Sequence, residues 1–469
     1  MTVSVVWFRR DLRVHDHVAL ATAVDAGDRV APLFVVDDRL LDGRWRSPNR
    51  LWFMRGSVAA LADALALRGA PLAVLRGDPR RLVPAFAESV GAKRVLVSRD
   101  YAPFGRARDR AVAQGLAGLG IGFEEAPGGL IVEPESVATA AGTPYRVYGP
   151  FRKTWLTVPR REVLPAPTSI QRAQVQRSGV GRPPLRARIE DVLDAIVPTA
   201  DPQSLPEAGE PAARQRLEHW ATGAGLERYA LDRDRLDLPS TSRLGADLRW
   251  GLLSPIEVAD RCAGERDGPR RFLDELAWRD FYAHLLWHEP RVARHAFRSE
   301  FEDVARSADP ALVAVWAAGR TGYPVIDAAM RQLHATGWMP NRARMLVASF
   351  LTKDLGIDWR IGEAHFMTHL VDGDPASNNG GWQWAASTGT DSQPWFRVFD
   401  PTAQGRRHDP DGTYVRRWVP ELRGIDGDVV HAPPHGTYLR PIIDHAEGRA
   451  VALACFRRRR LASVRPWPR

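Results

Sequence analysis

The residues best suited to chemistry lie in one stretch, DGDPASNNGGWQWAASTGTD, at positions 372–391. It holds two aspartates at its start, an Asn pair, a Gly pair and two tryptophans, and no apolar pattern of period 2 or 3.6 runs through it. If 377–387 are helical, Asn378 and Trp382 share one face and Trp384 points to another side. One face could then serve one ligand while Trp384 serves a second.

Two other segments offer similar sets of polar and aromatic side chains. In NRARMLVASF, Asn341 and Met345 share a helical face, while Arg344 points elsewhere and could meet an acid. In DELAWRDFY, Glu275 lies three and four residues before Trp278 and Arg279, so the three line one side. Each set alone is compatible with ordinary helix packing, but three in one region indicate a shared pocket.

A fourth segment, TSRLGADLRWG, begins at residue 241 with two hydroxyl side chains and an arginine. At a turn into a helix, Thr241 and Ser242 could donate to phosphate oxygens together with backbone N–H groups. A simple helix N-cap is the alternative interpretation.

Positioning these side chains requires an α/β part followed by a helical part. Apolar segments alternate with helical patterns at the start of the chain, which predicts a parallel sheet covered by helices on both faces. A Pro-, Gly- and Ser-rich stretch follows and predicts a connector, and the chain after that connector has helical periodicity. The predicted divisions are an α/β domain (1–130), an interdomain linker (131–210), a large all-helical domain (211–456) and a basic C-terminal tail (457–469).

Composition sets broad limits on the class of protein. The formal net charge is +9, but part of it lies in the tail RRRRLASVRPWPR, so charge alone is weak support for nucleic-acid binding. The two cysteines cannot form a disulfide framework or a structural zinc site by themselves, and we predict no metal site. Neither a signal peptide nor a membrane span is recognisable, so a cytoplasmic location is expected. Eleven of the sixteen tryptophans follow residue 249, which favours a pocket for flat aromatic ligands.

The ordered motifs resemble the DNA photolyase and cryptochrome family, and within it the class I cyclobutane pyrimidine dimer photolyases. The resemblance extends from residue 3 to about 455 and rests on VVWFRRDLRVHD, TSRL, ELAWRDFY, TGYPVIDAAMRQL, TGWMPNRARM, DLGIDWR and DGDPASNNGGWQWAASTGTDSQPWFRVFDPTAQG.

The resemblance implies FAD bound in the helical domain. Asn378 would lie at flavin N5, Arg344 would pair with Asp372, and Gly245 stands where relatives usually carry Ser, at the cost of at most one hydroxyl contact. The implied FAD-binding residues are Tyr229, Thr241, Ser242, Arg243, Leu244, Gly245, Phe272, Arg279, Trp338, Arg344, Asp372, Gly373, Asp374 and Asn378.

The implied activity is light-dependent repair of cyclobutane pyrimidine dimers by electron transfer from excited, reduced FAD to a dimer flipped out of the DNA. Catalytic roles would fall to Glu275, Asn378, Trp382 and Trp359. Contacts to the lesion and the damaged DNA would come from Arg233, Glu275, Trp278, Asn341, Arg342, Met345, Trp384, Arg397 and Gln404.

Two features of the resemblance concern light capture. Trp382 and Trp359 match the first two tryptophans of the electron route to oxidised flavin, but Arg306 stands where the third is expected, so photoreduction could be slow. The segment RDYAPFGRARD favours an 8-hydroxy-5-deazaflavin antenna over methenyltetrahydrofolate, and Arg106 replaces the Glu of folate binders. Plausible antenna contacts are Phe34, Asp37, Asp100, Arg108 and Arg249, although a loop that closes the sheet is an alternative for each.

Three alternatives to dimer repair remain for comparison. A cryptochrome-type blue-light signalling protein would more often lose the residues of the lesion pocket. A (6-4) photolyase would need paired histidines, and His365 and His369 share a helical face but lie outside the segment expected for them. A dark electron-transferring flavoprotein leaves the second set of tryptophans unexplained. Dimer repair by a monomer is the preferred prediction.

Overall fold

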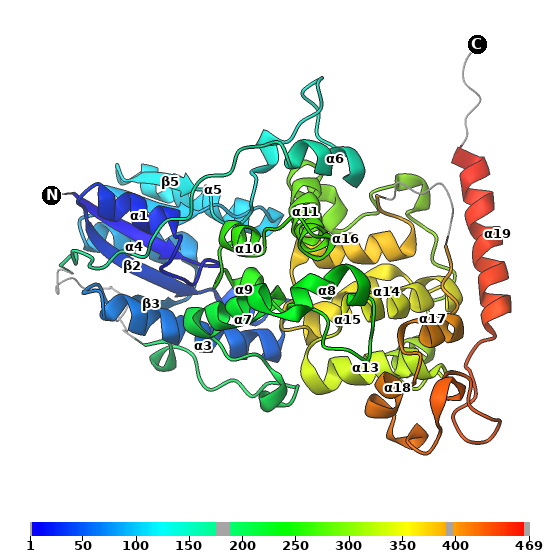
Figure 1. Cartoon of the computed structure of the whole chain (residues 1–469). Coiled ribbons are helices and arrows are strands. Elements are labelled where there is room, and N and C mark those ends of the chain that lie inside the picture. The colour runs from blue at the N-terminus through cyan, green and yellow to red at the C-terminus, as the bar shows by residue number, and fades with distance from the viewer. Residues whose placement is uncertain (1, 175–187, 391–396, 464–469) are drawn as a thin grey trace, which may run out of the picture.

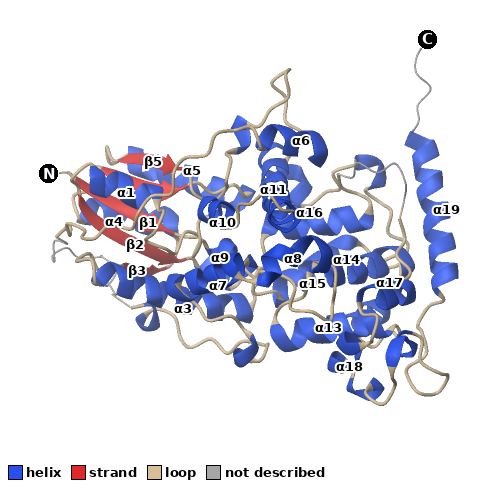
Figure 2. Ribbon diagram, viewed as in Figure 1, coloured by secondary structure: helices blue, strands red, loops and turns tan. Residues whose placement is uncertain are grey.

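The computed structural model describes residues 2–174, 188–390 and 397–463. Its N-terminal part is one parallel sheet in the order β3-β2-β1-β4-β5 (Figures 1 and 2). The strands are β1 (Val3–Phe8), β2 (Arg29–Val36), β3 (Ala73–Arg76), β4 (Arg94–Ser98) and β5 (Gly122–Ala126). The order places β1 in the centre, where the chain reverses its direction of winding, and ligands bind beyond the carboxyl ends of strands at such a point.

Side chains of β1 alternate between two apolar cores, as expected for a sheet covered on both sides. Val6 and Phe8 pack with α1 (Val18–Asp25) and α3 (Pro48–Ala66). Val5 and Trp7 face the opposite side and pack with α4 (Pro79–Ser89) and α5 (Pro103–Ala117). The predicted α/β fold class is therefore confirmed.

Many helices begin at an Asp-Pro or Ser-Pro pair, a start signal that can be recognised in the sequence. Ser47, Asp78 and Asp374 each accept a backbone N–H of the helix that follows, and proline occupies the first helical turn. A side-chain acceptor satisfies one of the unpaired N–H groups of a helix end, and proline has no N–H to lose there.

Two local predictions for this part were incomplete. The fifth strand, GFEEA, was missed because it is an edge strand whose side chains are largely exposed, so it lacks a buried alternating pattern. The segment RDYAPFGRARD is more than a closing loop, because helix α5 begins within it at Pro103.

The segment 131–210 connects the sheet to the helical part, and residues 175–187 of it lie outside the described ranges. Its described residues before Glu210 form one α-helix, α6 (Tyr148–Trp155), and three short 3-10 turns. Asp280 of the long helix α11 (Asp267–His288) holds the start of this segment in place. One of its carboxylate oxygens accepts from the backbone N–H of Ile131 (2.9 Å) and Val132 (3.1 Å) and from Nε1 of Trp155 (3.0 Å). The boundaries predicted for the domains stay a prediction.

Asp280 should make stability depend on pH in a predictable direction. Burial raises its pKa to about 6, above that of the unfolded chain, despite the counteracting charge of Arg279 and these hydrogen bonds. Folding therefore takes up a proton at Asp280 as the pH falls from 7 to 5, and this group alone stabilises the folded protein by about 1 kcal/mol over that interval. Urea unfolding at both pH values should show this gain for the wild type relative to Asp280→Asn. Glu265→Gln, at an exposed acid, is the control; a wild-type advantage that does not change with pH would contradict the prediction.

The α-helices after residue 209 form the C-terminal part (Figure 1) and confirm the predicted all-helical half. Besides α11, they are α7 (Glu210–Thr222), α8 (Ala224–Asp232), α9 (Gly245–Trp250), α10 (Pro255–Arg261), α12 (Pro310–Ala317), α13 (Pro324–Thr336), α14 (Asn341–Ser349), α15 (Trp359–His369), α16 (Pro375–Ala386), α17 (Pro401–His408), α18 (Thr413–Trp418) and α19 (His445–Ser463), with a short α2 (Asp38–Leu41) in the sheet domain and a π-helical turn at Phe350–Asp354.

Part of the predicted basic C-terminal tail (457–469) is helical. Helix α19 continues to Ser463 along the outer edge of the helical part (Figure 1), and residues 464–469 lie outside the described ranges. Within the described residues, none of the helices combines the length and apolar character that crossing a bilayer requires.

Candidate active site

A cavity of about 610 Å³ opens in the helical part, lined by α8, α11, α14, α16 and the turn before α16. It brings together most of the side chains singled out from the sequence. The predicted site residues that line it are Arg233, Glu275, Trp278, Arg279, Asn341, Arg342, Arg344, Met345, Asp372, Gly373, Asp374, Asn378, Trp382, Trp384 and Arg397. The shared pocket inferred from three helical segments is therefore present.

Helix α16 carries both tryptophans of the 372–391 stretch, Trp382 and Trp384. Asn378 donates from Nδ2 to the carbonyl oxygen of Glu363 at 3.1 Å, which fixes its amide. Trp382 is buried against Phe366, with ring centroids 4.9 Å apart, while Trp384 is half-buried. Both indoles border the one cavity, so they serve different parts of the same space rather than separate pockets.

Helix α11 supplies an acid and an aromatic ring on the same side. Glu275 forms an ion pair with Arg233, and Nη2 of Arg271 lies 3.3 Å from its Oε1. The Trp278 ring stacks on Tyr148 of α6, with centroids 3.7 Å apart and planes 9° apart. One face of the Trp278 indole is thus already covered, which holds the ring in one orientation.

The predicted pair of Arg344 and Asp372 is present at the cavity wall. Nη2 of Arg344 lies 2.8 Å from Oδ2 and 3.1 Å from Oδ1 of Asp372. Gly245 stands where relatives usually carry Ser, and the sequence analysis expected this difference to cost at most one hydroxyl contact. The structure shows a tighter constraint. A Cβ at this position would lie 2.7 Å from Oδ2 of Asp372, so any side chain here would displace that carboxylate.

Several predicted FAD contacts lie away from the cavity lining. Tyr229 and Phe272 pack edge-to-face in the core, with centroids 5.5 Å apart. Arg243 has a left-handed backbone (φ 55°) and places its guanidinium 4.4 Å from the Trp338 ring centroid. The segment Thr241, Ser242 and Leu244 leads into α9, whose N-cap is Leu244 and not a hydroxyl residue, and Gln404 and buried Trp359 also lie outside the lining.

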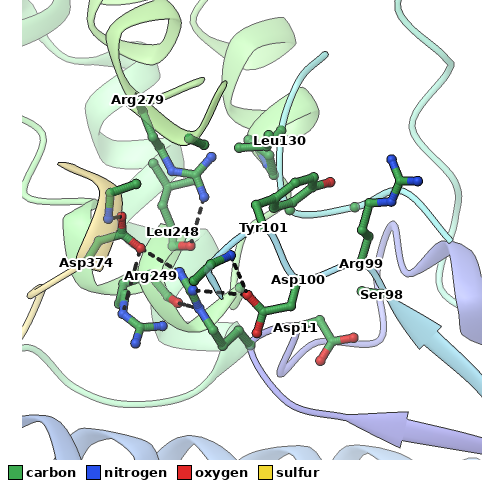
Figure 3. Close-up of a pocket in the computed structure, with 18 of the residues that line it drawn as sticks. Asp11, Ser98, Arg99, Asp100, Tyr101, Leu130, Leu248, Arg249, Arg279 and Asp374 are labelled. Carbon is green, nitrogen blue, oxygen red and sulfur yellow. Dashed lines mark hydrogen bonds and ion pairs between the residues drawn. The ribbon is translucent and has the colours of Figure 1, made fainter. Parts of the chain in front are cut away.

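The turn before α16 is fixed by arginines from both parts of the chain. Nη2 of Arg10, just after β1, lies 2.5 Å from Oδ2 of Asp374. Nε of Arg249 donates to the carbonyl oxygen of Gly373 at 2.9 Å. Figure 3 shows Asp374, Arg249 and Asp100 gathered around a small cavity of about 60 Å³ between the two parts. Burial opposes ionisation of Asp374, but the neighbouring arginines Arg10 and Arg249 hold its pKa below the usual range.

A second large cavity, of about 400 Å³, lies beyond the carboxyl ends of β1 and β2. All five predicted antenna residues line it: Phe34, Asp37, Asp100, Arg108 and Arg249. Arg106 lies elsewhere, with its guanidinium 3.8 Å from the Trp287 ring centroid. The strand order thus places a cavity where the sequence analysis expected an antenna.

The expected electron route is only partly recognisable in the packing. Trp382 and Trp359 are both buried in one apolar core, and the Trp316 ring centroid lies 6.1 Å from that of Trp382. Arg306, at the position expected for the third tryptophan, bonds to the carbonyl oxygen of Lys353. The side chain at 306 is therefore a structural contact of the π-helical turn.

The comparisons with known proteins cover both parts of the chain. Residues 4–169 match a family model described as "DNA photolyase", and residues 272–458 match one described as "FAD binding domain of DNA photolyase". The deoxyribodipyrimidine photo-lyase of Escherichia coli (strain K12) is 38% identical over 477 aligned residues, which cover 97% of this chain and 98% of that protein. The chain belongs to the DNA photolyase family. This confirms the predicted family and, at the level of the family, the predicted lyase class.

Solved photolyase structures have the same fold. A bacterial class III photolyase from Agrobacterium tumefaciens matches with a TM-score of 0.90 and 35% identity, covering 98% of both chains. The cryptochrome of Synechocystis sp. PCC6803 matches with a TM-score of 0.88 and 27% identity, covering 97% of this chain and 99% of that one. Fold similarity therefore extends to a photolyase and to a cryptochrome, and activity must be argued from the site.

The cavity of about 610 Å³ fits FAD, the cofactor named in the description of the family model that matches residues 272–458. Its volume lies within the range of about 300–1,000 Å³ typical of cofactor sites. A Cβ added at Gly381 would meet no atom within 4 Å, so the α16 backbone is open to a flat ring there. Nε1 of Trp382 is buried without a hydrogen-bond partner, and the Arg344–Asp372 pair offers charge at the wall.

Sequence reasoning missed two residues of this site. Tyr148 supports Trp278 from 130 positions away, and nothing in the α6 sequence indicates that contact. Tyr282, one turn after Trp278 on α11, also lines the cavity and could have been found from helical spacing.

Proposed function

We propose that this chain repairs cyclobutane pyrimidine dimers in DNA under blue light. The observation that carries the proposal is that one cavity, of about 610 Å³, is lined both by Asn378, Trp382 and the Arg344–Asp372 pair and by Trp278, Trp384 and Glu275. A flavin and a flipped dimer can therefore occupy adjoining parts of one cavity. When bound, reduced FAD supplies the excited electron that splits the cyclobutane ring.

The residues of the chain would position both ligands. Arg279, Arg344, Asp372, Gly373, Asp374 and Asn378 would hold FAD from the cavity wall, and Trp278 and Trp384 would stack against the flipped bases, a type of contact worth about 1–3 kcal/mol per base. Tyr148, stacked behind Trp278, would keep that wall in place before DNA arrives. The remaining predicted FAD contacts, Tyr229, Thr241 to Gly245, Phe272 and Trp338, stay predictions.

Glu275 needs a change of partner to take the role expected for it. Its carboxylate is paired with Arg233, and an ionised carboxylate only accepts hydrogen bonds. We expect Arg233 to turn toward a DNA phosphate when the lesion binds, which would leave Glu275 with Arg271 as its remaining arginine neighbour and open it to the thymine edge. Arg342, Arg397 and Gln404 are the other proposed DNA contacts, and Arg342 is likewise paired, with Asp234 at 2.5 Å. Binding should therefore weaken with salt.

The cavity beyond β1 and β2 is the proposed antenna site. Its five predicted contacts converge on one space, and Arg39, Arg44 and Arg50 add positive charge to the wall. The proposed antenna pigment is 8-hydroxy-5-deazaflavin rather than methenyltetrahydrofolate. Mass analysis of pigment released from the purified protein distinguishes the two.

The test of the proposed function is photoreversal of a defined lesion. The reduced, FAD-loaded protein is mixed with an oligonucleotide that carries one thymine dimer, exposed to blue light, and followed by the return of thymine absorbance. We expect recovery in the light and none in a dark control. No recovery with FAD bound and reduced would contradict dimer repair and favour the signalling role of a cryptochrome. Recovery on a (6-4) substrate would favour the other repair activity, although His365 and His369 lie outside the described lining of the cavity.

A further inference from the structure

Three histidines from two helices meet behind the large cavity. His365 and His369 lie one turn apart on α15, and His334 lies in the last turn of α13. One ring nitrogen of each lies within 4.8 Å of those of the other two. The His365 and His369 rings stack with centroids 4.2 Å apart, and the His334 ring lies 4.7 Å from His369.

The hydrogen bonds of this trio leave lone pairs available. Nε2 of His334 lies 2.8 Å from the carbonyl oxygen of Ala317, and Nδ1 of His369 lies 2.8 Å from that of His365. Because a carbonyl oxygen only accepts, both nitrogens carry the proton, and Nδ1 of His334 and Nε2 of His369 each keep a lone pair. A second nitrogen bonded to a carbonyl is the usual support of a metal-bound imidazole.

His365 has an unsatisfied group of its own. Its Nε2 is buried and has no hydrogen-bond partner, although buried polar atoms are normally paired.

The electrostatic setting also favours a cation. His334 and His369 lie in the last turns of their helices, where the backbone carbonyls carry partial negative charge. Two histidines four residues apart on one helix with a third from another element are a ligand set known for zinc, with Zn–N distances near 2.0–2.1 Å. The three nitrogens, within 4.8 Å of one another, would have to move toward a common centre to reach that distance.

We propose that His334, His365 and His369 bind one zinc-like divalent transition-metal ion, with water as the fourth ligand. The ion would join the end of α13 to α15, the helix that leads into the Asp372–Asp374 turn. It is a structural site and does not depend on the proposed repair activity.

The test uses the full-length, FAD-loaded protein, which is first stripped of metal with EDTA and then incubated with zinc. We expect one zinc ion per chain to remain after gel filtration, measured by elemental analysis, and the unfolding temperature to rise with zinc. His369→Gln and His334→Gln should each weaken zinc binding at least about tenfold. His219→Gln and His435→Gln, at exposed histidines, are the matched controls and should bind zinc as the wild type does.

Folding of each variant is checked by circular dichroism and by its bound flavin. If half-buried His365 or His369 proves necessary for folding, His334→Gln at the helix end still decides the question. Zinc retained equally by the trio variants and the controls, or not retained by the wild type, overturns the proposal. A zinc-soaked crystal gives an independent answer: an anomalous peak among the three rings supports the site, and its absence there contradicts it.

Discussion

Trp278→Ala should weaken binding of a dimer-containing oligonucleotide roughly 5- to 150-fold and lower light-driven repair at limiting DNA by the same factor. The range follows from about 1–3 kcal/mol for one base stacked on an aromatic side chain, at about 1.4 kcal/mol per tenfold. The indole lines the large cavity and is held by Tyr148, so the ring is ready to receive a base without reorganisation. The effect should be specific to damaged DNA, because undamaged duplex does not enter the cavity.

The measurement is a fluorescence-anisotropy titration of damaged and undamaged oligonucleotides, followed by repair at saturating and limiting DNA. Tyr148→Leu is the matched control, because it removes the support behind Trp278 and leaves the stacking surface itself. We expect it to lose less affinity than Trp278→Ala. Equal losses on damaged and undamaged DNA would contradict the stacking role of Trp278, and bound FAD must be unchanged for the comparison to hold.

Asp374→Ala should destabilise the junction of the two parts by about 3 kcal/mol and release FAD at lower urea. The carboxylate pairs with Arg10 of the sheet domain and, at 3.9 Å, with Arg249. Its Oδ1 also caps α16, accepting from the backbone N–H of Ala376 (3.0 Å) and Ser377 (3.1 Å). Loss of a cap costs about 1 kcal/mol and an unpaired buried charge about 3–5 kcal/mol. Because the Asp374 side chain is 20% exposed, solvent screens part of the charge term, and we expect the total to fall to about 3 kcal/mol.

Asp374→Asn separates these two contributions. It keeps an oxygen that can cap α16 and removes the charge that the arginines need, so its urea midpoint for flavin release should lie between those of the wild type and Asp374→Ala. The pKa of Asp374 is held below its usual range, so the stabilisation by its charge is present at neutral pH and is lost as the pH falls through that lowered value. The wild type should therefore approach Asp374→Asn in strong acid. Identical midpoints for all three proteins at neutral pH would show that the junction does not depend on this carboxylate.

Helical spacing was enough to predict much of the cavity. The i, i+3 and i, i+4 rules correctly placed Glu275, Trp278 and Arg279 on one wall, and the succession of apolar and helical segments correctly predicted a parallel sheet covered on both faces. Local geometry of this kind is dictated by neighbours along the chain. The ion pair of Arg344 with Asp372 came from the family resemblance and not from spacing.

Spacing failed where exposure or an unusual backbone decided the structure. The edge strand β5 has no buried side to produce a pattern. The Thr241–Gly245 segment contains a left-handed residue, Arg243, and the N-cap of α9 is Leu244 rather than a hydroxyl residue. Residues 457–463 form part of α19, although the sequence analysis assigned them to a basic C-terminal tail.

The family and the two-part fold could be predicted from the sequence alone, which also suggested the side chains that we propose to meet a flavin and a flipped base. Which distant residues share a space became visible only in the folded structure. Tyr148 stacks on Trp278, Arg10 reaches Asp374 across 364 positions, and His334 joins His365 and His369. The physical reason is that helical spacing is set by backbone geometry within one element, whereas contacts between elements depend on how apolar faces pack. No pattern along the chain records that packing, so the paired arginines and the histidine cluster became visible only after folding.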